Sequence, residues 1–220
     1  MKVDIWSDVR CPFCYIGKKK FEESLARFAN KDQVEVIWHS FELDPNLETE
    51  PGISSMDHFV RNKGISVTQA EQMNKRVLQM AGEVGLDFNM DKTVVANSFN
   101  AHRLIQFAKT RGLGNEIEEA LFKAHFTEGK NIDDKPVLRE IGEAVGLKAV
   151  DLDRVLFTDE YAKEVREDQK HAHQIGVRGV PFFVFNGKYA VSGAQPQDAF
   201  LEVLEKSWGE FVDKEETFGS

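Results

Sequence analysis

Residues 4–15 read DIWSDVRCPFCY and hold both cysteines of the 220-residue chain, in the spacing Cys11-x-x-Cys14. An apolar, strand-like run ends just before this motif, and a helical pattern begins just after it. Cys11 is therefore expected at the first turn of a helix, where unpaired backbone N–H groups and the helix dipole favour a thiolate. Cys14 lies one turn further on the same face and can close a disulfide onto Cys11. Pro12 fits this turn because its missing N–H needs no partner there. The motif indicates a dithiol redox site.

Three other interpretations of the cysteine pair stay open at this point. Free cysteines are often inert core residues. The pair could also be half of a zinc site completed by His171 and His173, although His-x-His is not the usual spacing for structural zinc. A structural disulfide is least favoured, since so short a loop constrains the unfolded chain very little. The coincidence of strand, motif and helix favours the redox interpretation, and no metal site is predicted.

The segments that flank the motif predict a βαβ unit. Phe21, Leu25 and Phe28 recur at helical spacing. Residues 33–41 are rich in the β-branched and aromatic side chains typical of a strand, and a right-handed crossover is expected between the two strands. We interpret His39, on the second strand, as a hydrogen-bonded, partly buried histidine rather than a catalytic base.

The pattern is then almost wholly helical until an α/β pattern returns. A Pro- and Gly-containing linker follows residue 45, and helices are predicted over 66–85 (opened by a capping box at Ser66), 98–110, 115–126, 136–145 and 152–157. A charged helix over 159–174, a hairpin turning at Asn186-Gly187, a last helix from Pro196 and a frayed acidic tail from residue 213 complete the chain. We therefore predict an α/β domain, residues 1–45 and 158–220, carrying an inserted helical domain, residues 46–157.

The composition excludes some classes of partner. A formal net charge of −9 with no basic run argues against nucleic acid and against an anionic membrane surface. No apolar run approaches the length needed to span a bilayer. Residues 1–4 lead directly into the first strand, without the basic and apolar segments of a signal peptide. We therefore expect a cytoplasmic protein, in which a Cys-x-x-Cys pair is more often catalytic than structural.

Three motifs together resemble one family. They are residues 7–17 (SDVRCPFCYIG), residues 97–104 (NSFNAHRL) and residues 177–184 (VRGVPFFV). With the long helical insertion, they resemble the DsbA-like branch of the thioredoxin superfamily, and most closely its cytoplasmic, FrnE-like members. The resemblance covers nearly the whole chain and implies a thioredoxin-like fold with a large inserted all-helical domain.

The resemblance also implies roles for particular residues. Cys11 would be the exposed nucleophile and Cys14 the resolving thiol, with Val180-Pro181 as a cis-proline turn that faces them. Together with Pro12 and Phe13, this turn would bind substrate, because the residue before such a proline offers its backbone N–H and C=O to an extended chain. The insertion would cover the active-site face and shape the groove.

The sequence departs from the better-known relatives at two places. Thioredoxin and DsbA carry a buried acid six residues before the first cysteine, where this chain has Ile5. Asp4 and Asp8 flank that position, but alternation turns Asp4 to the other face of the strand. Either the proton leaves through Asp8 or water, or the exchange is slower. In addition, Phe13 stands where DsbA has a histidine, so we predict a weaker oxidant than DsbA.

The predicted function is therefore that of a thiol–disulfide oxidoreductase acting on protein or small-molecule disulfides and dithiols. No tightly bound cofactor is expected, and glutathione or another small thiol is a candidate co-substrate. His102 and Arg103 would either line the groove or form an ordinary surface pair on a helix. The alternatives are a glutathione-dependent isomerase or transferase, as in the related hydroxychromene-carboxylate isomerase and kappa-class branches, and a non-catalytic peptide-binding module. Direction of electron flow and oligomeric state are left open, with a homodimer among the candidates.

Overall fold

The computed structural model describes the backbone of residues 1–218 and the side chains of residues 1–212. Its central sheet has the strand order β2-β1-β5-β6 and is built from β1 (Lys2–Ser7), β2 (Glu35–Ser40), β5 (Phe182–Phe185) and β6 (Tyr189–Ser192). β1 runs parallel to β2 and antiparallel to β5, which pairs antiparallel with β6. Asn186 and Gly187, both at positive φ, form the predicted turn between β5 and β6.

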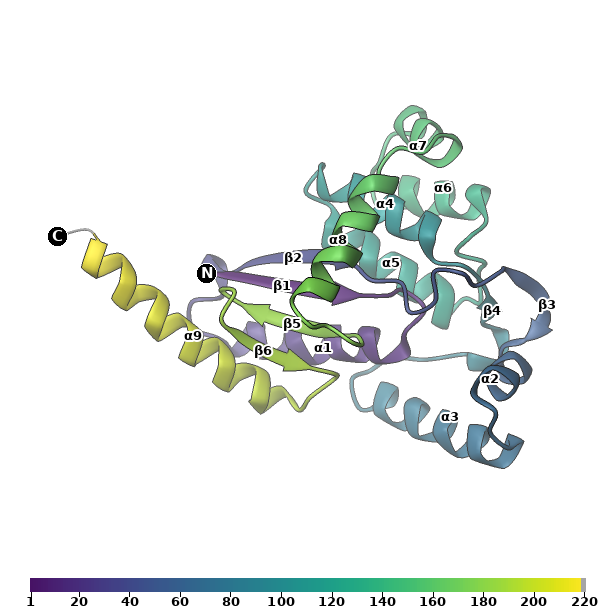
Figure 1. Ribbon diagram of the computed structural model, residues 1–220, viewed down its shortest axis with the longest axis horizontal. Helices are drawn as coiled ribbons and strands as arrows, with labels where there is room; N and C mark the ends of the chain where they lie inside the picture. The colour runs from purple at the N-terminus through teal and green to yellow at the C-terminus, as the bar shows by residue number, and fades with distance from the viewer. Residues whose placement is uncertain (219–220) are drawn as a thin grey trace.

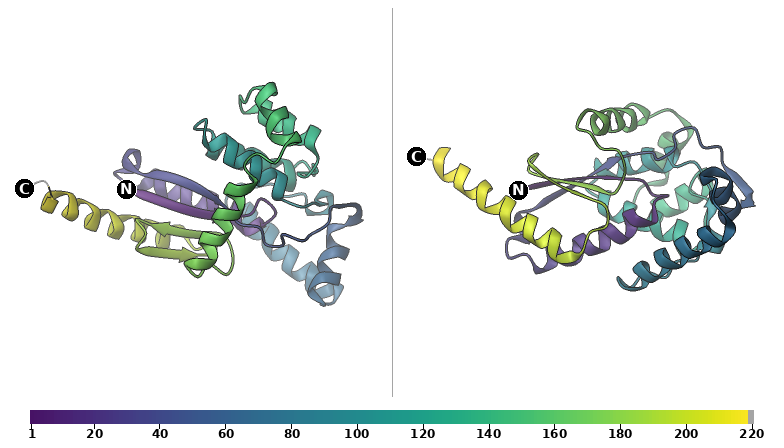
Figure 2. Two further views of the ribbon diagram at one scale, coloured as in Figure 1. Left: turned by 45° about the horizontal axis from the view of Figure 1, so that its top comes forward. Right: turned by 60° about the horizontal axis from the view of Figure 1, so that its bottom comes forward.

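Helices cover both faces of the sheet (Figures 1 and 2). α1 (Pro12–Arg27) and α9 (Gln197–Phe218) lie on one face, and α8 (Ala162–Gln174) lies on the other. The alternation of β1 explains this arrangement: Val3 and Ile5 pack with Phe21 of α1 and Phe200 of α9, whereas Trp6 packs with Ala172 of α8. The predicted frayed tail is helical as far as Phe218, because its Lys and Glu residues are good helix formers that extend an existing helix.

Between β2 and α8 the chain forms a mostly helical block, which includes one helix and one pair of short strands that the pattern did not predict. Its helices are α2 (Ser55–Lys63), α3 (Val67–Gly82), α4 (Phe99–Lys109), α5 (Gly114–Phe126), α6 (Lys135–Ala144) and α7 (Ala149–Phe157). The unpredicted elements are α2, which buries no side chain completely, and an antiparallel pair, β3 (Glu50–Ser54) with β4 (Val94–Val95). β3 contains Pro51 and Gly52, which argue against a strand. The capping box at Ser66 and Gln69 forms as predicted.

The start of α1 belongs to the core of this helical block. Cys11, Cys14 and Tyr15 are buried with apolar side chains of the block, among them Ala101 of α4 and Phe122 of α5. Tyr15 stacks on Phe122 with ring centroids 4.8 Å apart. The predicted fold class, a thioredoxin-like fold with a large helical insertion, is confirmed.

Candidate active site

Cys11 is the residue that caps the N-terminus of α1, with an extended backbone at φ −91° and ψ 112°. Its N–H donates to Asp8 O at 2.9 Å, and its carbonyl accepts from Cys14 N at 3.0 Å. These bonds hold the Cys-x-x-Cys turn and direct both side chains to one side. Both thiols are free, and both are buried, with 5 % of Cys11 and 1 % of Cys14 exposed. Cys14 is therefore almost completely closed to solvent, and Cys11 is slightly more accessible.

The Val180-Pro181 segment lies over Cys11. The peptide bond between these two residues is cis, and the Cys11 thiol donates to Val180 O at a Sγ–O distance of 3.6 Å. Gly17 of α1 allows this close approach, because a Cβ there would lie only 2.9 Å from Pro181 Cγ. The expectation of an exposed nucleophile is corrected in this respect: the Val180 carbonyl covers Cys11, and little of the thiol faces solvent.

The Cys14 thiol is held in its protonated form. Burial raises its pKa well above the ordinary value, and the neighbouring Cys11 sulfur adds to the shift. The backbone N–H of Asp8 and the Ser7 hydroxyl act in the opposite direction. A thiol in this environment must first lose its proton to become a nucleophile.

The hydrogen bonds of the Asp8 carboxylate go to groups other than the Cys14 thiol. It accepts from the backbone N–H groups of Arg10 at 3.1 Å and Leu43 at 2.8 Å, and His102 Nε2 lies 3.5 Å from Asp8 Oδ1. Burial alone would raise the pKa of Asp8, but the His102 contact, Arg10 and the Leu43 amide hold it below the ordinary value. Asp8 therefore stays ionised and fixes the loop, which makes it a poor acceptor for the Cys14 proton.

His102 and Arg103 lie neither in a groove nor on a surface, and both expectations for them were wrong. His102 is 1 % exposed, and although burial opposes its protonation, contact with Asp8 raises its pKa. Arg103 donates to backbone carbonyls at the C-terminal end of α7, namely those of Val155, Thr158 and Glu160. His102 and Arg103 are adjacent on α4 and contact different neighbours. Their burial follows from the tertiary packing of α4 and could not be recognised in the sequence.

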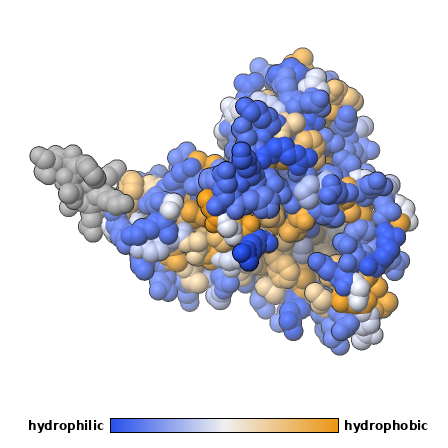
Figure 3. All heavy atoms as spheres, in the orientation of Figure 1, coloured by the Kyte–Doolittle hydropathy of each residue, from blue (hydrophilic) through white to orange (hydrophobic). Residues whose placement is uncertain are grey.

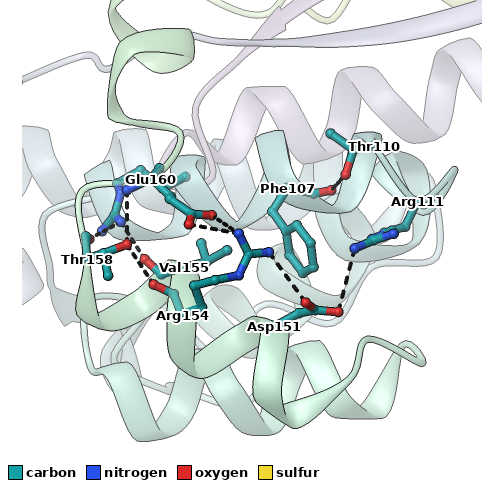
Figure 4. Close-up of polar contacts among 9 residues, drawn as sticks. Phe107, Thr110, Arg111, Asp151, Arg154, Val155, Thr158 and Glu160 are labelled. Atoms are coloured by element: carbon teal, nitrogen blue, oxygen red, sulfur yellow. Dashed lines mark hydrogen bonds and ion pairs between the residues drawn. The ribbon is translucent and has the colours of Figure 1, made fainter.

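Other arginines of the block are also engaged in the structure. Figure 4 shows Arg154 reaching both Glu160 and Asp151, with Arg111 on the other side of Asp151. These pairs join α7 to the turn that follows α4 and to the connection that leads into α8. They stabilise the helical block and offer no free cation to a ligand.

His39 joins β1, β2 and α8. Its Nδ1 lies 2.8 Å from Asp168 Oδ1, its Nε2 lies 2.7 Å from Asp4 Oδ1, and its ring stacks on Trp6 at 4.5 Å between centroids. Burial opposes its protonation, but the two carboxylates raise its pKa. These contacts support the interpretation of His39 as a hydrogen-bonded, partly buried histidine. The sequence could not indicate Asp168, which is 129 positions away along the chain.

The histidines considered for a zinc site have aromatic neighbours instead. The His171 ring packs edge-on against Trp6, and the His173 ring lies 6.0 Å from Phe41. Within residues whose side chains are described, no group of three or more His, Cys, Asp or Glu side chains could hold a metal ion.

Phe13 of the motif and α3, a helix that contacts α1, expose apolar side chains. Phe13, which follows Pro12 in the motif, is 39 % exposed, and Met73 and Leu78 of α3 are 51 % and 39 % exposed. Figure 3 shows apolar side chains gathered between the sheet and α3 on the face it presents. Phe13 therefore offers an exposed apolar side chain within the Cys-x-x-Cys motif.

Comparison with known proteins agrees with this geometry. The family model of the DsbA-like thioredoxin domain matches residues 2–205. The chain belongs to this family. A crystal structure described as a probable DsbA oxidoreductase, SCO1869 from Streptomyces coelicolor, is 37 % identical and superposes with a TM-score of 0.90 over 96 % of this chain and 91 % of its own. The uncharacterized protein YwbO of Bacillus subtilis is 30 % identical over 92 % of this chain and 94 % of its own length.

A more distant neighbour shares the fold. The cytosolic disulfide reductase DsbM from Pseudomonas aeruginosa is 19 % identical, with a TM-score of 0.67 over 94 % of this chain and 98 % of its own. The chain belongs to the DsbA-like family, and a similar structure is described as a probable oxidoreductase. Both findings support a redox enzyme in general terms. Among the described helices, none has both the length and the apolar composition to cross a membrane.

Proposed function

We propose that this protein exchanges thiols and disulfides through Cys11 and Cys14. The observation that carries the proposal is the pair itself: two free thiols at the N-terminus of α1, with the outer one against the Val180 carbonyl. Unpaired N–H groups at a helix N-terminus stabilise a thiolate. Because both thiols are present, the arrangement favours redox chemistry over a site that uses a single nucleophile.

The reaction follows from the difference between the two thiols. The Cys11 thiolate attacks a substrate disulfide, so that a bond forms between Cys11 and one substrate sulfur and the other sulfur leaves as a thiolate. Cys14 then attacks Cys11 Sγ, closes the Cys11–Cys14 disulfide and releases the second substrate thiol. The same steps in reverse oxidise a dithiol. We propose that an extended substrate binds to the backbone of Val180 and contacts Pro12 and Phe13 of the motif.

The substrate is proposed to be a protein or small-molecule disulfide or dithiol, with glutathione as a candidate co-substrate. DsbM, which shares the fold, has been solved with glutathione, and its description as cytosolic agrees with the compartment expected for this chain. The exposed apolar side chain of Phe13, inside the motif, fits a peptide better than a small polar thiol.

The decisive test is covalent trapping with glutathione disulfide and with a peptide disulfide. We expect Cys14→Ser to accumulate a mixed disulfide on Cys11, detected as an intact-mass increase, and Cys11→Ser to form none. Full exchange activity in Cys11→Ser would refute the proposal. Isomerase or transferase activity that survives in Cys14→Ser would favour the glutathione-dependent alternative, and peptide binding without either thiol would favour a binding module.

A redox titration in glutathione buffers then gives the direction of electron flow. A Cys11–Cys14 potential near about −270 mV, as in thioredoxin, indicates a reductase, and one near about −120 mV, as in DsbA, indicates an oxidant. We expect a value more reducing than that of DsbA, because Phe13 supplies neither charge nor a hydrogen-bond donor beside the nucleophile. The absence of any intramolecular disulfide at every buffer ratio would refute the dithiol mechanism.

A further inference from the structure

Arg10 directly precedes the nucleophile Cys11, and the exchange described above gives its side chain no role. The residue is half-buried. Within the described part of the chain its guanidinium forms no ion pair, and its Nη1 is buried without a hydrogen-bond partner. A buried donor on a charged group costs free energy when it stays unpaired. The position therefore suits an anion that comes from outside the chain.

Other cationic side chains that are partly or fully buried have partners. Arg103 donates to three backbone carbonyls, and Arg139 forms two ion pairs, each 3.4 Å long. Lys18 of α1 pairs with Glu119 at 2.8 Å. Arginines on the open surface are solvated by water and need no such partner. Arg10 thus differs from the other arginines with buried surface, because its charge is unpaired among residues 1–212.

The Asp8 carboxylate does not neutralise Arg10 by direct contact, although it is close in the chain. Its oxygens accept from the backbone N–H groups of Arg10 at 3.1 Å and Leu43 at 2.8 Å, and His102 Nε2 lies 3.5 Å from Oδ1. These contacts hold the loop before Cys11. They leave the guanidinium of Arg10 available to another carboxylate.

The charge of Arg10 acts on two histidines of the helical block. Burial lowers the pKa of His125 on α5 to about 4, and the Arg10 charge adds to this shift. Burial, Arg61 and then Arg10 lower the pKa of His58 on α2. The His125 side chain is 5 % exposed, and its Nδ1 has no hydrogen-bond partner in the part of the chain with described side chains. At neutral pH the His125 ring is therefore uncharged, with a polar atom unused.

A substrate joined to Cys11 comes within reach of Arg10. In a mixed disulfide the Cα atoms of Cys11 and of the substrate cysteine are about 4.4–6.8 Å apart. Consecutive Cα atoms such as those of Arg10 and Cys11 are about 3.8 Å apart. The Arg10 Cα therefore lies at most about 11 Å from the Cα of the substrate cysteine. An arginine side chain and a carboxylate side chain that extend toward each other can span this distance.

Resting on the proposed thiol–disulfide exchange, we propose that Arg10 binds a carboxylate of the substrate beside the disulfide that Cys11 attacks, and so selects acidic substrates. The carboxylate belongs to an acidic residue next to the substrate cysteine or to glutathione. A guanidinium binds a carboxylate through two parallel N–H groups. Such a bond gives the Arg10 side chain the partner that it lacks, and it discriminates against neutral substrates of the same size.

Two peptide disulfides that differ at one position test this inference. Each is a symmetrical dimer of a peptide with blocked termini and a single cysteine, preceded by Glu in one peptide and by Gln in the other. Both peptides and glutathione disulfide are reacted with Cys14→Ser, and the rate of mixed-disulfide formation on Cys11 is followed by intact mass. We expect the Glu peptide to react about tenfold faster than the Gln peptide, the lower end for a charge-assisted hydrogen bond.

Variants in the same Cys14→Ser background identify the residue responsible. Arg10→Gln should slow the Glu peptide about tenfold and leave the Gln peptide within about twofold. Arg10→Lys keeps the charge but loses the two parallel bonds, so it should keep part of the preference. Arg27→Gln removes an arginine from the exposed end of α1 and should change neither rate. The ratio of the two peptide rates within one protein cancels any effect of a variant on Cys11 reactivity or on folding.

Glutathione disulfide distinguishes the two sources of the carboxylate. A loss in Arg10→Gln that is confined to the Glu peptide indicates an acidic peptide, and a loss that includes glutathione disulfide indicates that the small thiol is bound in the same way. A loss in Arg10→Gln that is equal for all three substrates, or no loss for any of them, would overturn the inference. The proposed function fails in a different way, with no mixed disulfide in Cys14→Ser from any substrate.

Discussion

His39 offers the sharpest prediction about stability, because it is shared by two carboxylates on different elements. Substitution His39→Gln keeps a similar volume but removes the charge, and the amide cannot reach both Asp4 and Asp168. Each charge-assisted hydrogen bond contributes about 1.5–3 kcal/mol. With the side chain 13 % exposed, we take the lower value for each of the two bonds, so the variant should be about 3 kcal/mol less stable. For a chain of this size that lowers the melting temperature by about 6–12 °C.

The pH dependence identifies the interaction. The pKa of His39 is raised in the folded protein, so its stabilisation is fully present below its unfolded value of about 6.5 and is lost as pH rises through the folded value. The pKa values of Asp4 and Asp168 are lowered, so their contribution is present above about pH 3.8 and is lost as pH falls through their folded values. The difference between wild type and variant should therefore be largest between about pH 4 and pH 6.5 and should narrow in alkaline buffer.

Urea unfolding followed by circular dichroism, from about pH 5 to about pH 9, measures this difference. His173→Gln is the matched control, since His173 is exposed on α8 and should leave stability within about 0.5 kcal/mol of wild type. A difference for His39→Gln that is the same at every pH would refute the assignment of an imidazolium held between two carboxylates.

Two more predictions follow from contacts around α1. Gly17→Ala should displace Pro181, destabilise the protein by about 1–3 kcal/mol and slow thiol–disulfide exchange. Gly209→Ala, whose Cβ would lie in open space, should neither destabilise the protein nor slow exchange. A Gly17→Ala variant as stable and as fast as wild type would contradict the packing argument. Burial opposes ionisation of Glu119, but Lys18, Lys19 and Tyr15 lower its pKa to about 2. Its stabilisation is therefore present above about pH 4.5 and is lost as pH falls through about 2. Glu119→Gln should destabilise the protein by about 1–2 kcal/mol at neutral pH, after allowance for solvent screening, and by much less near pH 2; urea titrations at both pH values measure this.

Local patterns account for most of the fold prediction. Hydrophobic spacing, the capping box at Ser66 and the turn at Asn186-Gly187 act over a few residues, so they can be recognised in the sequence. The elements that escaped prediction have weak local signals. α2 buries no side chain completely, and the pairing of β3 with β4 depends on partners about forty positions apart.

The candidate site also combines features that the sequence indicates with features that only the tertiary structure shows. The Cys11–Cys14 spacing at a strand–helix junction is a local signal, and it was sufficient to predict the pair as a candidate dithiol site. The contact of the Cys11 thiol with the Val180 carbonyl and the pairing of His39 with Asp168 both join segments that are far apart in the chain. Burial and proximity set the protonation of these groups. Both arise only when the helical block packs against the start of α1, and so the chemistry of Cys14 is a property of the folded chain.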